Sequence, residues 1–188
     1  MNLISILVTS ILSSNIILSR FLGICPFIGT SNKSKDAFNM GISVTLVVTL
    51  STLITYAIYH LVLVPTDTTY LRTIIFILII ASLVQLLDIF IKKYAPKIGE
   101  ELGIYLPLIT TNCAILGTCL LVINNEYNLL ESLLYALGSG IGFTLVIYIF
   151  STIRERLDKS DIPASFKGTP IALIVAAIMA IIFSRYVI

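Results

Sequence analysis

Charged residues are scarce in this sequence. Only 12% of its 188 residues are Asp, Glu, Lys or Arg, about half the fraction that is usual in soluble domains. The formal net charge is only +2, so no basic excess points to nucleic acid. With 57% hydrophobic residues and a mean hydropathy of +1.03, the chain lacks the polar surface that a water-soluble fold needs. This composition excludes a soluble enzyme domain and favours a small polytopic membrane protein.

The sequence also lacks the signatures of several catalytic classes. It has no glycine-rich phosphate loop after a strand, no dinucleotide fingerprint, and no Ser–His–Asp or metalloprotease pattern. Nucleotide binding and hydrolytic chemistry are therefore not expected. Since no soluble domain of any size is present, we expect the chain to work as one component of a larger assembly.

Apolar stretches long enough to cross a bilayer recur along the chain. A helix rising 1.5 Å per residue needs about 20 apolar residues to span the hydrocarbon core. Short charged connections separate most of these stretches, which argues for a single membrane domain over residues 1–188. The sequence predicts six spans, at about residues 3–29 (interrupted by Gly and Pro), 40–64, 70–91, 102–123, 129–153 and 170–188.

The distribution of Lys and Arg predicts the orientation. The connections after the first, third and fifth spans hold ten of these residues, and the opposite side holds only Arg72 and Arg185. Basic residues are retained on the cytoplasmic side of membrane proteins. We therefore expect these three connections in the cytoplasm and both termini outside. The longest connection, residues 154–169, is expected to be a solvated loop.

A short motif occurs twice. The segments Cys25–Thr30 and Cys113–Thr118 share the order Cys, any residue, two apolar residues, Gly, Thr, at an offset of 88 residues. The halves, about 1–94 and 95–188, each hold three predicted spans, so the second half would insert upside down. Helix breakers interrupt the first and fourth spans, as in inverted repeats with a functional centre near the bilayer midplane. The expected fold is all-α, with six transmembrane helices in two inverted three-helix repeats.

The three cysteines admit several interpretations. Buried cysteine often packs as a small hydrophobe, and this interpretation is preferred for Cys119. For Cys25 and Cys113 a disulfide is a second possibility, although the odd count and the reducing side of the membrane disfavour it. A third is that the two thiolates bind iron. Two thiolates are half of the usual four, so a second chain would have to supply the others.

Polar residues directly before Cys113 have two explanations. Thr110, Thr111 and Asn112 could bond to carbonyl groups freed by Pro107. Alternatively, they could donate hydrogen bonds that tune a redox centre on the cysteine sulfur.

Two further polar residues lie within predicted spans and are candidates for an ion path. Asn15 lies in the first span, where it could instead bond to the backbone. Asp88 lies late in the third span, four residues before Lys92, and this spacing equally suits a helical ion pair near the membrane surface.

Four segments together resemble a known family of membrane proteins. They are residues 21–27, 106–114, 154–157 and 166–168, and the resemblance extends over essentially the whole chain. The family includes the A subunit of the Rnf complex and the similar E subunit of the sodium-pumping NADH:quinone oxidoreductase. Pro26 and the Phe-Lys-Gly stretch ending at Gly168 favour the Rnf branch.

The resemblance implies a component of a bacterial cytoplasmic-membrane complex that moves electrons between ferredoxin and NAD and couples this to Na⁺ or H⁺ transport. It also implies that the chain pairs with a paralogous E subunit, beside the B, C, D and G subunits. Each of the two paralogues would give two cysteines to an intramembrane [2Fe–2S] cluster, here Cys25 and Cys113. The chain alone would have no catalytic activity. The alternatives are a secondary transporter or channel without a redox centre, and a scaffold protein.

Overall fold

The computed structural model describes residues 3–12, 14–66, 68–94, 106–160, 163 and 166–184. Within these ranges all regular secondary structure is helical, in agreement with the predicted all-α class. The elements, in chain order, are α1 (Leu3–Ile11), α2 (Ile24–Gly29), α3 (Ser34–Ile58), the π-helical turn η1 (Tyr59–Leu63), the 3₁₀ turn η2 (Thr69–Leu71), α4 (Arg72–Tyr94), α6 (Leu106–Thr110), α7 (Cys113–Asn124), α8 (Leu129–Leu157) and α9 (Thr169–Ser184).

Several of these helices are long and apolar enough to cross a membrane. Four such stretches occur among the described residues, at Ser34–Leu63, Thr69–Phe90, Pro107–Asn124 and Leu129–Leu157, and Thr169–Phe183 is a shorter apolar helix. The four stretches correspond to the second to fifth predicted spans, and the shorter helix lies within the sixth. Residues 102–105 and 185–188 of the predicted spans lie outside the described ranges. The first predicted span is not one continuous helix. With nine residues, α1 rises only about 14 Å.

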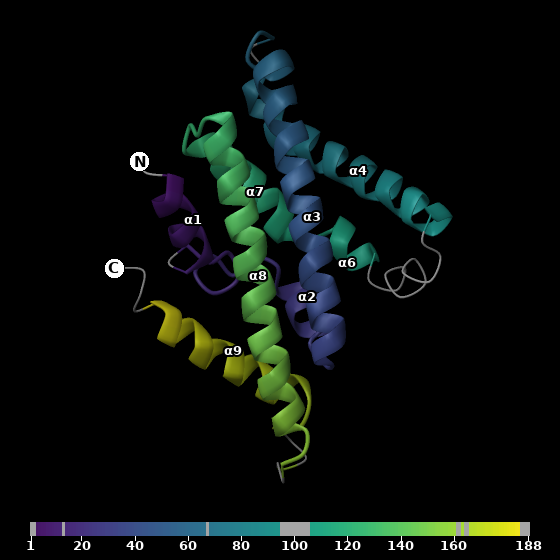
Figure 1. The fold of residues 1–188 in the computed structure, drawn as a ribbon, viewed down its shortest axis with the longest axis vertical. Coiled ribbons are helices and arrows are strands. Elements are labelled where there is room, and N and C mark those ends of the chain that lie inside the picture. The colour runs from purple at the N-terminus through teal and green to yellow at the C-terminus, as the bar shows by residue number, and fades with distance from the viewer. Residues whose placement is uncertain are drawn as a thin grey trace.

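The centre of the molecule is the antiparallel pair α3 and α8 (Figure 1). A Cβ built on Gly41 would lie 2.6 to 2.8 Å from atoms of Thr144, and one on Gly140 would lie 2.7 to 2.8 Å from atoms of Thr45. The two threonine hydroxyls lie 3.2 Å apart. Each also donates to the carbonyl of the glycine one turn earlier in its own helix, at 2.8 and 2.9 Å. The contact between the two helices is therefore close and reciprocal.

A second face of α8 receives α1. A Cβ on Gly138 would collide with the Ser10 hydroxyl, and one on Gly142 would lie 2.9 Å from the carbonyl oxygen of Ile11. Gly138 and Gly142 are one helical turn apart, so they form a small-residue strip along which the α1 backbone can lie. The side chains on α8 thus leave room for one helix on each of two faces.

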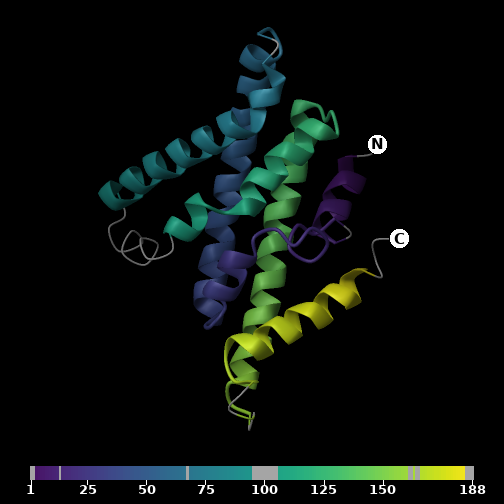
Figure 2. The same cartoon turned by 180° about the vertical axis from the view of Figure 1, so that it is seen from behind.

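Helices are interrupted shortly before each of the two repeated motifs. In the first half α1 ends at Ile11, and α2 begins only at Ile24; in the second half α6 ends at Thr110, and α7 begins at Cys113. Figure 2 shows α6, α7 and α2 on the side of α3 and α8 that faces away from the viewer in Figure 1. The breaks place backbone N–H groups at the starts of α2 and α7 without intrahelical partners.

Candidate functional site

Cys113 is the first residue of α7, directly after the break in the helix. Asn112 caps this helix, and its side-chain oxygen accepts the backbone N–H of Ala114 at 3.0 Å. Asparagine is a preferred N-cap because this bond replaces a missing intrahelical one. The Cys113 side chain is half-buried. Its sulfur therefore lies at the positive end of a helix dipole, where negative charge is stabilised.

The structure brings the segment that carries Cys25 to the sulfur of Cys113. The backbone N–H of Gly23 donates to the Cys113 Sγ at 2.9 Å, across 90 residues of sequence. Gly23 is the N-cap of α2, and Cys25 is the second residue of that helix. The residue two positions before the first motif therefore contacts the first residue of the second motif. An N–H donor on a cysteine sulfur is the kind of contact that tunes thiolate ligands of iron.

Gly23 is held in a position that only glycine suits. Its φ is +82°, in the left-handed region. A Cβ there would lie 2.9 Å from Phe143 Cε2, 3.1 Å from the Ala114 Cβ and 3.4 Å from the Asn112 Oδ1. Without a side chain, the Gly23 backbone can approach both α7 and α8. This close approach is what aims its N–H at the sulfur.

The three cysteines differ in exposure. Cys25 is exposed, while Cys119 is buried with its sulfur 3.7 Å from the Thr52 hydroxyl. The contacts of Cys119 are those of a packing residue. Among the described residues, no three His, Cys, Asp or Glu side chains come together in a way that could hold a metal ion. With Cys119 packed away from them, Cys25 and Cys113 are the two thiols that remain as candidate ligands in the described part of the chain.

The polar residues before Cys113 have separate environments. Thr111 is exposed, and its hydroxyl donates to the Pro107 carbonyl at 2.8 Å, the backbone contact that the structural interpretation predicts. Thr110 is half-buried. Asn112 is 3% exposed, and its Nδ2 has no hydrogen-bond partner in the described part of the protein. A buried amide donor without a partner is costly, and it lies beside the Cys113 site.

The two ion-path candidates lie in different surroundings. Asn15 is 1% exposed and bonds only to nearby backbone: its Oδ1 accepts the Ile17 N–H and its Nδ2 donates to the Ile11 carbonyl, both at 3.1 Å. These bonds satisfy the chain where α1 ends. Asp88 is half-buried on α4, and the Lys92 side chain expected to pair with it lies outside the described residues. An ion path through either residue stays a prediction.

Arg154 and Glu155 belong to a segment, residues 154–157, that the sequence singled out only for its family resemblance, and they hold the connection between α2 and α3. The expectation that a loop starts at Arg154 is wrong, because α8 continues to Leu157. Arg154 is 9% exposed. Its Nη1 donates to the Ile28 carbonyl at 2.8 Å and to the Ser31 hydroxyl at 2.9 Å. Its place four residues after buried Phe150 was the signal that it faces inward.

Glu155 completes this attachment. Its carboxylate accepts the Ser34 backbone N–H at 2.6 Å and also the Ser34 hydroxyl. Ser34 is the first residue of α3, where acidic groups are favourable. Phe27 of α2 also stacks on Phe150 of α8, with ring centroids 4.1 Å apart. The end of α8 therefore fixes the short helix that carries Cys25.

We expect Arg154→Gln to loosen this attachment. Hydrogen bonds from a charged donor contribute about 1.5–3 kcal/mol each, so the variant should denature at a lower temperature. The measurement is thermal denaturation of the purified assembly, followed by size exclusion. Arg156→Gln is the matched control, since Arg156 is exposed in the same helical turn. Equal stability of the two variants would contradict the role of Arg154.

Comparison with known proteins gives a consistent result. The family model described as Rnf-Nqr subunit, membrane protein, matches residues 3–187. A protein of Acetobacterium woodii, named as the A subunit of a Na(+)-translocating ferredoxin:NAD(+) oxidoreductase complex, is 51% identical over 97% of this chain and 95% of its own length. Two proteins named as the A subunit of an ion-translocating oxidoreductase complex are similar as well. The one from Syntrophotalea carbinolica is 46% identical over 98% of this chain and 96% of its own length, and the one from Aeromonas hydrophila is 45% identical over 96% and 94%.

Proposed function

Because this chain belongs to the Rnf-Nqr family of membrane proteins, we infer that it is the membrane-embedded A subunit of an ion-translocating ferredoxin:NAD oxidoreductase complex. The names of its relatives, at 45–51% identity over nearly the full chain, support this function. The chain is one component of a redox-driven translocase and is a multi-pass membrane protein. Transport by the complex is coupled to Na⁺ or H⁺.

We further propose that Cys25 and Cys113 are two ligands of an iron–sulfur cluster. The observation that carries this proposal is the hydrogen bond from the Gly23 N–H to the Cys113 sulfur. When bound, such a cluster supplies one-electron transfer inside the membrane. The residues of this chain suit its negative charge: the Gly23 N–H and the N-terminus of α7 both direct positive partial charge at the Cys113 sulfur.

The remaining ligands would come from a second chain, for which we propose the paralogous E subunit. Four thiolates are usual for a [2Fe–2S] cluster, and this chain's motifs supply two. The exposure of Cys25 supports a shared site, since its thiol is reachable from outside the protein. The B, C, D and G subunits would complete the assembly.

We also propose that residues 1–94 and 95–188 are inverted repeats with six spans in all. In this arrangement α1, the break and α2 form the first span, and α9 belongs to the last. Two reciprocal contacts support it. In one, Gly41 of α3 packs against Thr144 of α8, and Gly140 of α8 packs against Thr45 of α3. In the other, a Cβ on Gly117 would meet Leu22, while one on Gly29 would meet Leu108.

The proposed location is the bacterial cytoplasmic membrane, with both termini outside. The basic residues that follow the first, third and fifth spans support this orientation. Moving one charge across the membrane takes about 2.3 kcal/mol per 100 mV. An electron site within the membrane would let electron transfer and ion movement share this energy.

The test of the function uses inverted membrane vesicles from a strain that lacks this chain. Reduced ferredoxin and NAD⁺ are added, and NADH formation and ²²Na⁺ uptake are followed. We expect both to be absent, and both to return when the chain is restored; acidification sensitive to a protonophore would identify H⁺ instead. Solute transport by the chain alone in proteoliposomes, without ferredoxin, would favour the alternative of a secondary transporter or channel.

A further inference from the structure

A groove runs along one face of the central helix pair. Its volume is about 890 Å³, and Thr45 of α3 and Thr144 of α8 lie between its walls. The walls are six large side chains that are 40–51% exposed: Phe38, Ile42, Leu46, Ile141, Leu145 and Tyr148. At one end the groove is bordered by Ser34 and Lys35.

This groove faces away from the cysteine site. Its wall on α8 includes Ile141 and Leu145. Phe143 lies two residues from both, about 200° round the helix, and is the residue closest to the Gly23 position beside Cys113. A partner that shares a cluster at the cysteines would therefore dock on the other side of α8. The groove needs a different occupant.

Between its two ends the groove is lined mainly by apolar side chains, and its two threonine hydroxyls are already bonded. The hydroxyls of Thr45 and Thr144 bond to each other and to carbonyl groups of their own helices. The other wall residues are apolar apart from the Tyr148 hydroxyl. Such a surface offers few hydrogen-bonding groups to the polar side chains of a protein partner, whereas a hydrocarbon chain needs only apolar contact.

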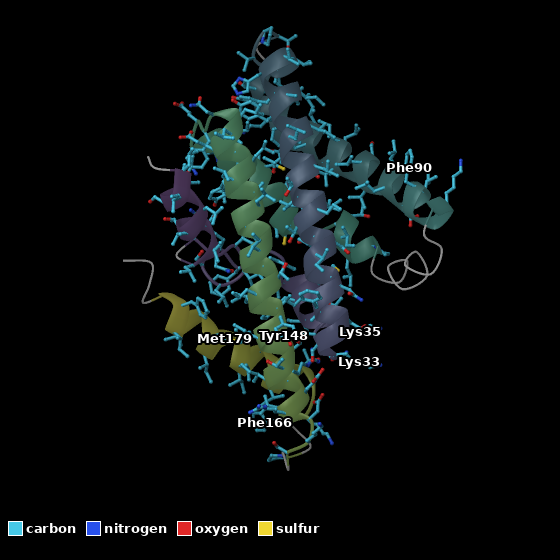
Figure 3. All side chains as sticks on the ribbon, in the orientation of Figure 1. Lys33, Lys35, Phe90, Tyr148, Phe166 and Met179 are labelled. Atoms are coloured by element: carbon cyan, nitrogen blue, oxygen red, sulfur yellow. The ribbon has the colours of Figure 1, made fainter. Side chains whose placement is uncertain are left out.

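Charged side chains border the groove at one end only. Lys35 borders the groove, and Lys33 precedes it by two residues; both are exposed. Figure 3 shows the two lysines at one end of α3, with Tyr148 on the neighbouring part of α8. Tyr148 meets Phe38 edge-on at 6.2 Å, an aromatic pair of the kind found at headgroup level. Long lysine side chains near a helix end reach the headgroup region.

The acidic residues nearest this end, Asp36 and Glu155, do not line the groove. Asp36 lies two residues before Phe38, which places it about 160° from Phe38 around the axis of α3. It therefore lies on a different face of α3 from the groove wall. The Glu155 carboxylate is already bonded to the Ser34 N–H and hydroxyl. A positive end and an apolar length together match an amphiphile with an anionic headgroup.

We propose that this groove binds one anionic phospholipid. An acyl chain lies between α3 and α8 over Thr45 and Thr144, and the phosphate lies beside Lys35 and Lys33. The lipid would close a surface that the described helices leave open, on the face opposite the cysteines. This proposal rests on membrane insertion of the chain and not on the cluster.

The first experiment measures retained lipid by native mass spectrometry. The purified complex is exchanged into nanodiscs of phosphatidylglycerol or phosphatidylcholine. We expect preferential retention of phosphatidylglycerol, reduced by about fivefold for each lysine in Lys33→Gln and Lys35→Gln. The matched control is Lys93→Gln, an exposed lysine on α4 that does not border the groove. Equal retention by control and test variants would overturn the proposal.

The second experiment distinguishes lipid from protein. The photoreactive residue p-benzoylphenylalanine is placed at Leu145, and the complex is irradiated in its native membrane. Lipid adducts on this chain, lost when Ile42→Trp fills the groove, support the proposal. A crosslink to another protein of the complex would show that the groove is a protein interface and would overturn it.

Discussion

Replacing either Cys25 or Cys113 by serine is expected to remove the same iron–sulfur EPR signal from the purified complex, and to lower its iron content by about two atoms for a [2Fe–2S] cluster. Thiolates are the natural ligands of such clusters, and a serine oxygen does not replace them. Because the Gly23 N–H, two residues before Cys25, donates to the Cys113 sulfur, we expect both variants to affect one shared centre. The measurement is low-temperature EPR with iron analysis on complexes whose subunits are all present.

Cys119→Ser is the matched control for this prediction. Cys119 is 1% exposed and packs against Thr52, so its replacement should leave iron and the signal unchanged. A signal that survives in both Cys25→Ser and Cys113→Ser, with normal assembly, would make these thiols packing residues. The scaffold or transporter interpretation would then be preferred over an electron relay.

Sequence predicted the long apolar helices well, because their signal is local. The helices α3, α4, α7 and α8 each contain a long apolar stretch with few charges, and a helical backbone is the way such a stretch satisfies its own hydrogen bonds in lipid. The first span was harder. The Asn15 side chain bonds to the Ile11 carbonyl and to the Ile17 N–H. These bonds compete with the backbone hydrogen bonds of a continuous helix, and whether they form depends on the conformation of the Asn15 side chain.

The site was only partly predictable. The paired motifs identified Cys25 and Cys113 as related residues, and Asn112 was noticed as a polar residue inside a span. The bond from Gly23 to the Cys113 sulfur was missed, because it joins residues 90 positions apart and requires a positive φ. Arg154 was assigned to a loop because charge usually ends a span. Its burial depends on the Ile28 carbonyl, which is distant in sequence.

Gly23→Ala is expected to disturb the site strongly without removing a ligand. The alanine would have to keep a φ of +82°, at a cost of about 1–2 kcal/mol. Its Cβ would also press on Phe143 Cε2 at 2.9 Å and on Ala114 at 3.1 Å. The backbone would relax away from α7, and the N–H would leave the Cys113 sulfur. A sulfur that loses this donor favours the oxidised state, so we expect a reduction potential lower by roughly 60 mV, a tenfold change for one electron.

Two variants separate crowding and hydrogen bonding from backbone strain. Gly168 has a φ of +90° with no neighbour within 4 Å of its Cβ position, so Gly168→Ala carries comparable backbone strain and no crowding. EPR-monitored redox titration should show a normal potential for this control. Adding Phe143→Leu to Gly23→Ala shortens the side chain that the new Cβ meets, and the potential should return part of the way. If Gly23→Ala titrates like the wild-type complex, the Gly23 N–H does not tune a centre at Cys113, and the close approach of the two motifs serves packing alone.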